Sequence, residues 1–185
     1  RGLIASVPRL VVEGPGGAPI WDMPGYAFVE GDAPDSVNPG LWRQARLNNI
    51  HGLFEVGEGI YQLRGFDLSN MTLIAGERGW IVVDPLTARE TAARALAFAR
   101  EHLGDKPVSA IIYTHSHIDH FGGVLGVASA EEIAARGIRV IAPEGFMEEA
   151  TSENMLAGST MGPRAAYMYG QHLAHAPRGH VATGL

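Results

Sequence analysis

Short runs of β-branched, aromatic and other apolar residues recur through the middle of the chain, and glycine or other turn residues separate them. Runs of this length and composition are typical of β-strands. The first two runs flank Gly57-Glu58-Gly59, which predicts a hairpin. The pattern predicts strands over residues 53–56, 60–64, 71–75, 80–83, 108–113 and 138–142.

A helical pattern follows the fourth of these strands. Thr87 and Glu90 have the spacing of a capping box, in which each side chain accepts a hydrogen bond from the other residue's backbone N–H. Apolar residues then recur on one helical stripe as far as Leu103, and Gly104 ends the pattern. The sequence therefore predicts a helix over about 87–103.

Helices are predicted at three further places. Ser129 and Glu132 form a second capping box in front of a short helix. Other helices are expected over 41–47 and from beyond Pro143 to about residue 151. After Gly158 the apolar positions show no regular period, so that segment is predicted to be irregular.

The order of strands, helix, strand, helix and strand implies an α/β architecture with helices packed on a sheet. Residues 1–52 differ because glycine and proline are frequent there, and they are predicted to form an irregular N-terminal extension with one short helix. Trp21 and Trp42 are expected to attach this extension to the rest of the protein. The packed domain is predicted to begin at residue 53.

Composition narrows the possible functions. With 46% hydrophobic and 18% charged residues, the 185-residue chain suits one soluble globular domain. Its net charge of −6 and the lack of a basic run argue against nucleic acid as a partner. No apolar stretch approaches the roughly 20 residues of a transmembrane helix. Because the chain has no cysteine, a bound metal must use His, Asp or Glu, and periplasmic, secreted and cytoplasmic locations all stay open.

Four potential metal ligands lie within six residues after the predicted strand 108–113. Residues two apart in an extended segment point the same way, so His115 and His117 can face one ion. Asp119 and His120 can then face a second ion. Zinc binds neutral imidazole nitrogen and carboxylate oxygen, so the pattern predicts half of a two-metal site at the end of a strand.

Other residues are weaker candidates. Asp84 follows strand 80–83, where its carboxylate can accept a hydrogen bond from a ligating histidine and fix the ring, or can simply end the strand in a turn. His172, His175 and His180 are conceivable ligands near the end of the chain, but their context is typical of a surface loop.

Four acidic residues and four methionines lie between residues 144 and 168. We interpret the acidic cluster as mainly solvated, and the methionines as core residues or as the lining of a groove for an alkyl chain. The acidic residues are Glu144, Glu148, Glu149 and Glu153, and the methionines are Met147, Met155, Met161 and Met168.

The His-x-His-x-Asp-His motif, followed by two glycines, resembles the signature of the metallo-β-lactamase-like hydrolases. Longer strings are similar to the alkyl sulfatase branch of that superfamily, and the likeness extends over about residues 39–170. These strings are Leu-Trp-Arg-Gln at 41–44, Asn-Asn-Ile-His-Gly-Leu-Phe at 48–54, the segment 60–72, Ala-Pro-Glu-Gly-Phe at 142–146 and Ser-Glu-Asn at 152–154.

The resemblance implies that residues 53–185 form roughly the N-terminal half of an αββα sandwich. It further implies a zinc-dependent hydrolase that cleaves alkyl sulfate esters to an alcohol and inorganic sulfate by a metal-bound hydroxide. His115 and His117 would bind one of two Zn²⁺ ions, Asp119 and His120 the other, with Asp119 as a catalytic residue. The remaining Glu and His ligands are expected in a further part of the catalytic polypeptide, and a homodimer is expected. Substrate-binding residues are not assigned.

Of three alternatives, a di-iron oxidoreductase is disfavoured by His117, and the other two remain open. Another hydrolase of the superfamily, acting on a thioester, lactone or β-lactam, shares the motif but should lack the strings at 41–44 and 66–70. A di-iron oxidoreductase would more typically carry glutamate in place of His117. The chain could also be an inactive fragment that needs a partner polypeptide to complete its site. A half-domain of this kind should expose an apolar surface.

Overall fold

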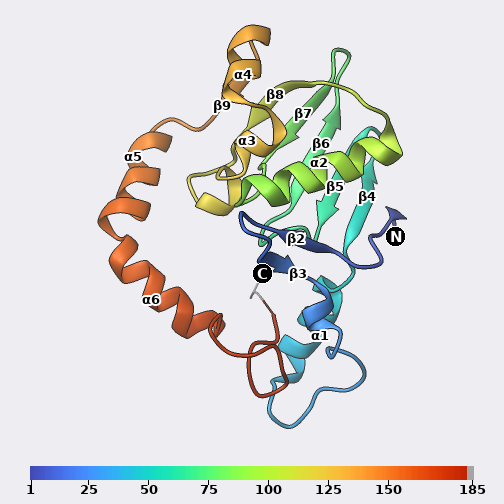
Figure 1. The fold of residues 1–185 in the computed structure, drawn as a ribbon, viewed down its shortest axis with the longest axis vertical. Coiled ribbons are helices and arrows are strands. Elements are labelled where there is room, and N and C mark those ends of the chain that lie inside the picture. The colour runs from blue at the N-terminus through green and yellow to red at the C-terminus, as the bar shows by residue number, and fades with distance from the viewer. Residues whose placement is uncertain (183–185) are drawn as a thin grey trace.

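A seven-stranded mixed sheet forms the centre of the protein (Figure 1). The structure, a computed structural model, describes residues 1–182; residues 183–185 of the predicted domain 53–185 lie outside the described residues. In spatial order the strands are β1 (Leu3–Ala5), β4 (Gly52–Gly57), β5 (Ile60–Arg64), β6 (Met71–Ala75), β7 (Trp80–Val83), β8 (Val108–Ile112) and β9 (Arg139–Ile141).

All six predicted strands are present, and their ends differ from the prediction by one residue at most. The strands from β1 to β7 pair antiparallel, whereas β7, β8 and β9 are parallel to one another. Parallel neighbours need a crossover connection, and α2 (Arg89–Leu103) supplies it between β7 and β8. The carboxyl ends of β7 and β8 therefore meet at one edge of the sheet.

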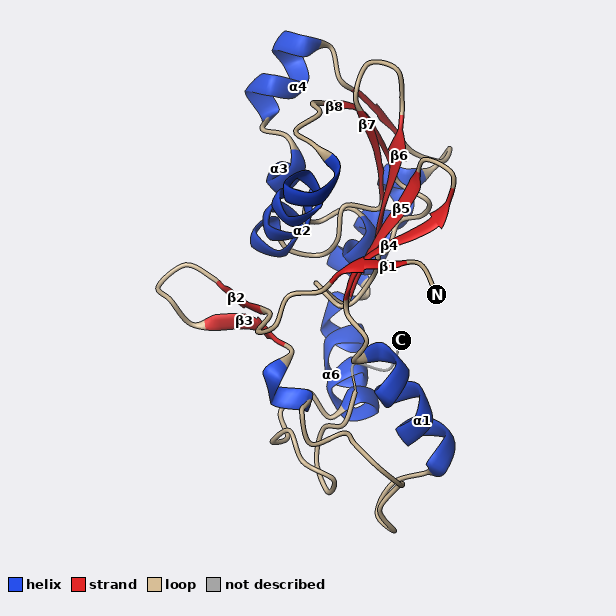
Figure 2. Ribbon diagram, turned by 90° about the vertical axis from the view of Figure 1, so that its right-hand side faces the viewer, coloured by secondary structure: helices blue, strands red, loops and turns tan. Residues whose placement is uncertain are grey.

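Three helices cover one face of this sheet. Figure 2 shows α2, α3 (Val124–Val127) and α4 (Ala130–Arg136) on the same side of the strands. The apolar stripe of α2 buries Leu96 and Phe98 in the core that the sheet also lines. Complete burial of a large apolar side chain stabilises the folded state by about 1.5–3 kcal/mol, so this layer contributes much of the stability.

The start of α2 differs from the prediction. The helix begins at Arg89, its N-cap is Ala88, and no side chain caps it, so the predicted capping box of Thr87 and Glu90 is wrong. The Thr87 hydroxyl instead donates a hydrogen bond of 2.6 Å to Asp67, which lies in an earlier loop. A tertiary contact has replaced the local one.

Two other predicted helix starts agree with the structure. The capping box of Ser129 and Glu132 at α4 is confirmed, with hydrogen bonds of 2.9 and 3.1 Å in the two directions. The helix predicted over 41–47 is α1 (Pro39–Asn48), and its N-cap Asn38 accepts a hydrogen bond from the backbone N–H of Gly40.

Residues 1–52 contain more regular structure than their glycine and proline content predicts. β1 joins the central sheet beside β4, while β2 (Val11–Glu13) and β3 (Pro19–Asp22) form a separate hairpin, followed by η1 (Pro24–Tyr26). Trp42 of α1 is buried, and the Trp21 indole N–H donates to the carbonyl of Gly65. Trp21 therefore connects the segment to the loop after β5, whereas the contacts of Trp42 with Phe28 and Gly31 lie within the segment itself. The division of the chain at residue 53 stays a prediction.

Beyond β9 the chain forms a helical arm, residues 146–169. The arm arches away from the central sheet and the helices packed on it, which together are called the body (Figure 1). It consists of α5 (Phe146–Thr151), the π-helix η3 (Ser152–Leu156) and α6 (Gly158–Tyr169). The prediction of irregular structure after Gly158 is wrong because α6 lies there. Pro163 inside α6 and the lack of a buried face explain why no helical period is visible in the sequence.

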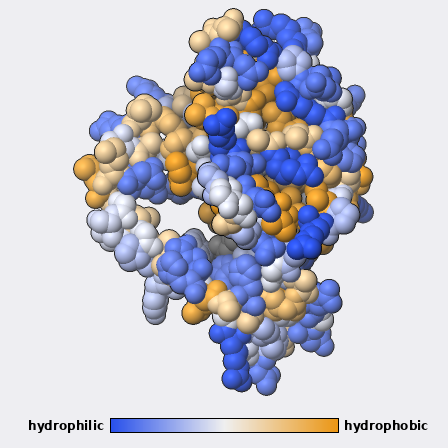
Figure 3. Space-filling view, in the orientation of Figure 1, coloured by the Kyte–Doolittle hydropathy of each residue, from blue (hydrophilic) through white to orange (hydrophobic). Residues whose placement is uncertain are grey.

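The arm is attached mainly at its two ends. Near β9, the Phe146 ring lies 5.3 Å from Tyr113 and 5.1 Å from Phe121, between ring centroids. Beyond α6, His180 contacts Tyr26 through a 2.8 Å hydrogen bond. No residue of α5, η3 or α6 is buried. Figure 3 shows an opening between the arm and the body.

None of the helices within residues 1–182 has both the length and the apolar character that crossing a bilayer requires.

Candidate metal centre

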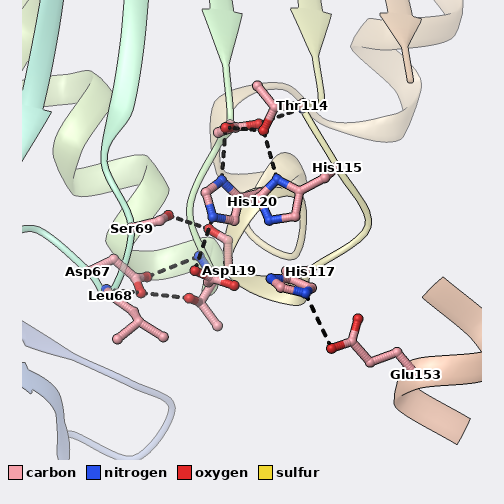
Figure 4. A network of polar contacts seen from close by, with 11 residues as sticks. Asp67, Leu68, Ser69, Thr114, His115, His117, Asp119, His120 and Glu153 are labelled. Atoms are coloured by element: carbon pink, nitrogen blue, oxygen red, sulfur yellow. Dashed lines mark hydrogen bonds and ion pairs between the residues drawn. The ribbon is translucent and has the colours of Figure 1, made fainter. Parts of the chain in front are cut away.

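The predicted ligands follow β8, at the edge where β7 and β8 both end. After Tyr113 the chain forms a short loop and then the 3₁₀-helix η2 (Ile118–His120). The ring centroid of His115 lies 4.5 Å from that of His117 and 4.1 Å from that of His120. The structure thus brings the three imidazoles of the motif together in one place (Figure 4).

Asp84, at the end of β7, supports this loop. Its carboxylate accepts hydrogen bonds from the backbone N–H of Thr114 (2.8 Å), the Thr114 hydroxyl (2.7 Å) and Nδ1 of His120 (2.8 Å). Its φ of 54° is a left-handed conformation, which Asp adopts more readily than most residues and which recurs in turns and at functional sites. Asp84 therefore has the contact that orients a ligating histidine.

These hydrogen bonds determine where two of the imidazoles carry their protons. The Thr114 hydroxyl gives its only hydrogen to Asp84, so its oxygen accepts from Nδ1–H of His115 at 2.9 Å. His120 likewise donates through Nδ1. Nε2 of each neutral ring then keeps its lone pair, which is the form that binds a metal. Burial, followed by the neighbouring His120 and His117, lowers the pKa of His115 and favours the same neutral form.

Asp119 and His120 make the pair that best fits a cation. Asp119 is buried, and its Oδ2 lies 3.2 Å from Nε2 of His120. When His120 donates through Nδ1, two acceptor atoms face each other there, and a proton or a metal ion between them relieves the repulsion. Two ligand atoms about 2.0–2.1 Å from a tetrahedral zinc ion are about 3.4 Å apart, which is close to the observed separation.

His117 is the most exposed of the three motif histidines. Its Nε2 lies 3.5 Å from Oε1 of Glu153, which η3 of the arm presents to the loop (Figure 4). Glu144, Glu148 and Glu149 are exposed, so the interpretation of the acidic cluster as mainly solvated is confirmed, and Glu153, whose side chain is 32% exposed, is its half-buried member.

A loop between β5 and β6 supports the motif from the other side. The Ser69 hydroxyl donates to the backbone carbonyl of Asp119 and so fixes the turn of η2. Two residues earlier, the Asp67 carboxylate accepts from the backbone N–H groups of Thr87 and Ala88 and from the Thr91 hydroxyl at the start of α2. The sequence resemblance includes this loop but gives no signal for these contacts, because the partners are 20 to 50 residues away.

Glycines set the distance between the motif and α2. A Cβ atom at Gly122, Gly123 or Gly126 would meet a backbone carbonyl oxygen within residues 85–89. The chain after the motif therefore packs backbone against backbone at this point, which only glycine permits.

Within the described residues 1–182, no group of three or more His, Asp or Glu side chains has the geometry to hold a metal ion. The motif supplies donors whose chemistry suits a metal ion. The histidines near the end of the chain do not join it, since His175 and His180 both contact Tyr26 and His172 is exposed.

A cavity of about 600 Å³ lies between α1 and the strands β4 and β5, and Trp21, Phe54 and Arg64 are among the residues that line it. The four motif residues are not part of its lining. The motif therefore lies outside this cavity.

Comparisons with known proteins agree with this geometry. The family model of the metallo-beta-lactamase superfamily matches residues 64–182, which is more than half of the chain and includes the whole motif. The chain belongs to the metallo-beta-lactamase superfamily. Membership implies a metal cofactor, and the donor chemistry of the motif is consistent with one.

Several superfamily members that resemble the chain are sulfatases. It is 49% identical to a linear primary-alkylsulfatase from Pseudomonas sp. and 44% identical to an alkyl/aryl-sulfatase from Saccharomyces cerevisiae; each alignment covers 100% of this chain but only 28% and 29% of the relative. The solved structure of a stereoselective inverting sec-alkylsulfatase from Pseudomonas sp. is 46% identical, with a TM-score of 0.92 over 100% of this chain and 29% of that one.

The chain thus spans less than a third of the length of these relatives. The high TM-score confirms the fold that the sequence resemblance implied, a portion of the metallo-β-lactamase-like fold of the alkylsulfatases.

Proposed function

We propose that this chain supplies one side of a two-zinc centre in an enzyme that hydrolyses alkyl sulfate esters to an alcohol and inorganic sulfate. The observation that carries the proposal is the Asp84–Thr114 network, which leaves Nε2 of both His115 and His120 with a free lone pair. The names of the similar proteins support the choice of substrate class.

His115 and His117 would hold one zinc ion, and Asp119 and His120 the other. Zinc ions bound there would lower the pKa of water towards about 7, which makes a nucleophile available at neutral pH. A complete set of ligands requires further Glu and His side chains from the remaining catalytic polypeptide, and the active assembly is proposed to be a homodimer.

The roles of the other residues follow from their contacts. Asp84 keeps the Nδ1 protons of the histidines in place, directly on His120 and through Thr114 on His115. Ser69 fixes the backbone of Asp119, so that its carboxylate stays beside His120. These groups orient the ligands before any substrate binds, which lowers the reorganisation needed during the reaction.

The reaction can break either the S–O or the C–O bond. The similar solved structure is that of an inverting sec-alkylsulfatase, and inversion at a secondary carbon requires attack at that carbon. We therefore favour C–O cleavage for secondary alkyl sulfates.

The test uses the full-length protein as its gene encodes it. The variant His117→Ala should release sulfate from a medium-chain alkyl sulfate at least about 100-fold more slowly, because loss of one ligand costs several kcal/mol on the barrier. His172→Ala is the matched control, since this exposed histidine lies outside the motif, and it should keep the wild-type rate.

Zinc content is measured on the same samples, with about two zinc ions per chain expected in the wild-type protein. Retention of half of the wild-type rate by correctly folded His117→Ala would contradict the proposal. A loss of activity in His172→Ala equal to that in His117→Ala would instead point to the histidines near the end of the chain as ligands.

A further inference from the structure

We propose that Glu153 is a positioning residue for His117: its carboxylate accepts Nε2–H of that ring and so turns Nδ1 towards the metal. The inference rests on the proposed function, because it assigns a role to a neighbour of a zinc ligand. It also gives the helical arm a role in the metal centre, since Glu153 belongs to η3.

The first observation is the contact itself. Glu153 Oε1 lies 3.5 Å from Nε2 of His117, and Figure 4 shows the two side chains turned towards each other across the space between arm and body. This separation is at the outer limit of a hydrogen bond, and a small movement of the exposed His117 ring brings it into range. The arm is the element that supplies a carboxylate to this ring.

The second observation is that the other two motif histidines have the same arrangement. One nitrogen of His115 faces the Thr114 hydroxyl, and one nitrogen of His120 faces the Asp84 carboxylate. A ligating histidine almost always donates its second ring N–H to such an acceptor, which fixes the tautomer and strengthens the ligand. Glu153 completes this pattern for His117. The free nitrogen is then Nδ1 in His117, whereas it is Nε2 in the other two rings.

The third observation concerns which side chains of η3 face the body. Met155 and Leu156 are 77% and 79% exposed, although they are apolar, while the charged Glu153 side chain is 32% exposed. The hydrophobic effect alone would favour the opposite arrangement. The segment is also a π-helix, a rare form that is frequent at functional sites. The orientation of Glu153 is therefore consistent with a function at the centre.

The experiment measures zinc affinity in the full-length protein, by competition with a chelator, for the wild type and two variants. Removal of an acceptor of this kind weakens metal binding about 10- to 100-fold, so Glu153→Ala should lose affinity by this factor at one of the two zinc ions. Glu153→Gln should recover part of the loss, because its amide oxygen still accepts a hydrogen bond. The zinc ion on Asp119 and His120 should keep its affinity.

Cobalt substitution gives a second measurement. The visible absorption of Co²⁺ at the His117 position should shift in Glu153→Ala, since the ring is no longer held in one orientation. Glu149→Ala is the control, because Glu149 is an exposed carboxylate on the same arm, and it should change neither affinity nor spectrum.

The outcomes separate the inference from the proposed function. Wild-type protein that binds no zinc overturns both. Wild-type protein that binds two zinc ions, with unchanged affinity and spectrum in Glu153→Ala, overturns only the role of Glu153. Equal weakening of both zinc ions also overturns it, because that result indicates a general structural effect.

Discussion

The body of the protein and its helical arm bury their apolar residues to opposite extents. In the body, Leu53, Leu63 and Leu73 are completely buried in the sheet. In the arm, Leu156 is 79% and Tyr167 95% exposed. Both regions are rich in apolar residues, so composition does not distinguish them. The difference is that helices cover one face of the sheet and bury its side chains, whereas the arm has no neighbour along most of its length.

Isolated helices of the length of α5 and α6 are marginally stable in water, because most helical stability in proteins comes from packing. The arm is therefore held by its end contacts, Phe146 on one side and His180 on the other, and by Glu153 between them. Its exposed residues agree with the expectation of an apolar surface.

The largest expected effect is on the free energy of unfolding, when one leucine is substituted in the body and one in the arm. Leu73→Ala should lower the free energy of unfolding by about 3 kcal/mol, since it leaves a cavity in the sheet. Leu156→Ala should change it by less than about 0.5 kcal/mol, because the side chain is already in solvent. Urea unfolding of both variants measures this. Equal destabilisation would show that the arm packs in solution.

A smaller effect is expected where the Asp67 carboxylate, in the loop between β5 and β6, contacts the start of α2. Asp67→Asn should destabilise the fold by about 2 kcal/mol, because hydrogen bonds to a charged acceptor are lost at the start of α2. Asp105→Asn, at an exposed ion pair with Arg100, should cost no more than about 0.5 kcal/mol and is the control. If urea unfolding gives the same small change for both, Asp67 does not stabilise the helix start.

The smallest effect is expected where the far end of the arm is attached. Tyr26→Phe removes the hydrogen bond to His180 and should cost about 1 kcal/mol at pH 7. Burial, followed by the charge of Asp22, raises the pKa of Tyr26 to about 12. An unfolded tyrosine releases its proton near pH 10, so the wild type should lose stability between about pH 10 and 12.

Tyr26→Phe should lack this part of the pH dependence, and unfolding curves recorded across that range provide the comparison. An identical alkaline slope in both proteins would show that Tyr26 is exposed in solution.

The sheet could be predicted from the sequence because its signals are local. Each strand is a β-branched or aromatic run bounded by a turn, and β6, bounded by Gly76 on one side, has the predicted ends. The segment of α6 gave no such signal, because a helix without a buried face has no apolar period. The helix start at Thr87 was predicted wrongly for a different reason: its hydroxyl bonds to Asp67, which no local pattern reveals.

The residues of the candidate site also fall into two groups, those that a local sequence pattern indicates and those that depend on contacts with distant segments. The four predicted ligands of the motif lie close together in the sequence, and the three imidazoles among them are neighbours in the structure; their role as ligands stays a prediction. Asp84 could be proposed because it ends the neighbouring strand. Ser69 and Glu153 could not, since their contacts with Asp119 and His117 depend on how a distant loop and the arm are placed.

The glycines behind the motif limit how the site can be transferred to another protein. Because Gly122, Gly123 and Gly126 each face a backbone carbonyl within residues 85–89, the motif and the start of α2 form one unit of backbone geometry. A designer who grafts only the His-x-His-x-Asp-His loop onto a new scaffold would lose the surface against which it is positioned. A functional graft needs both segments, with all three glycines retained.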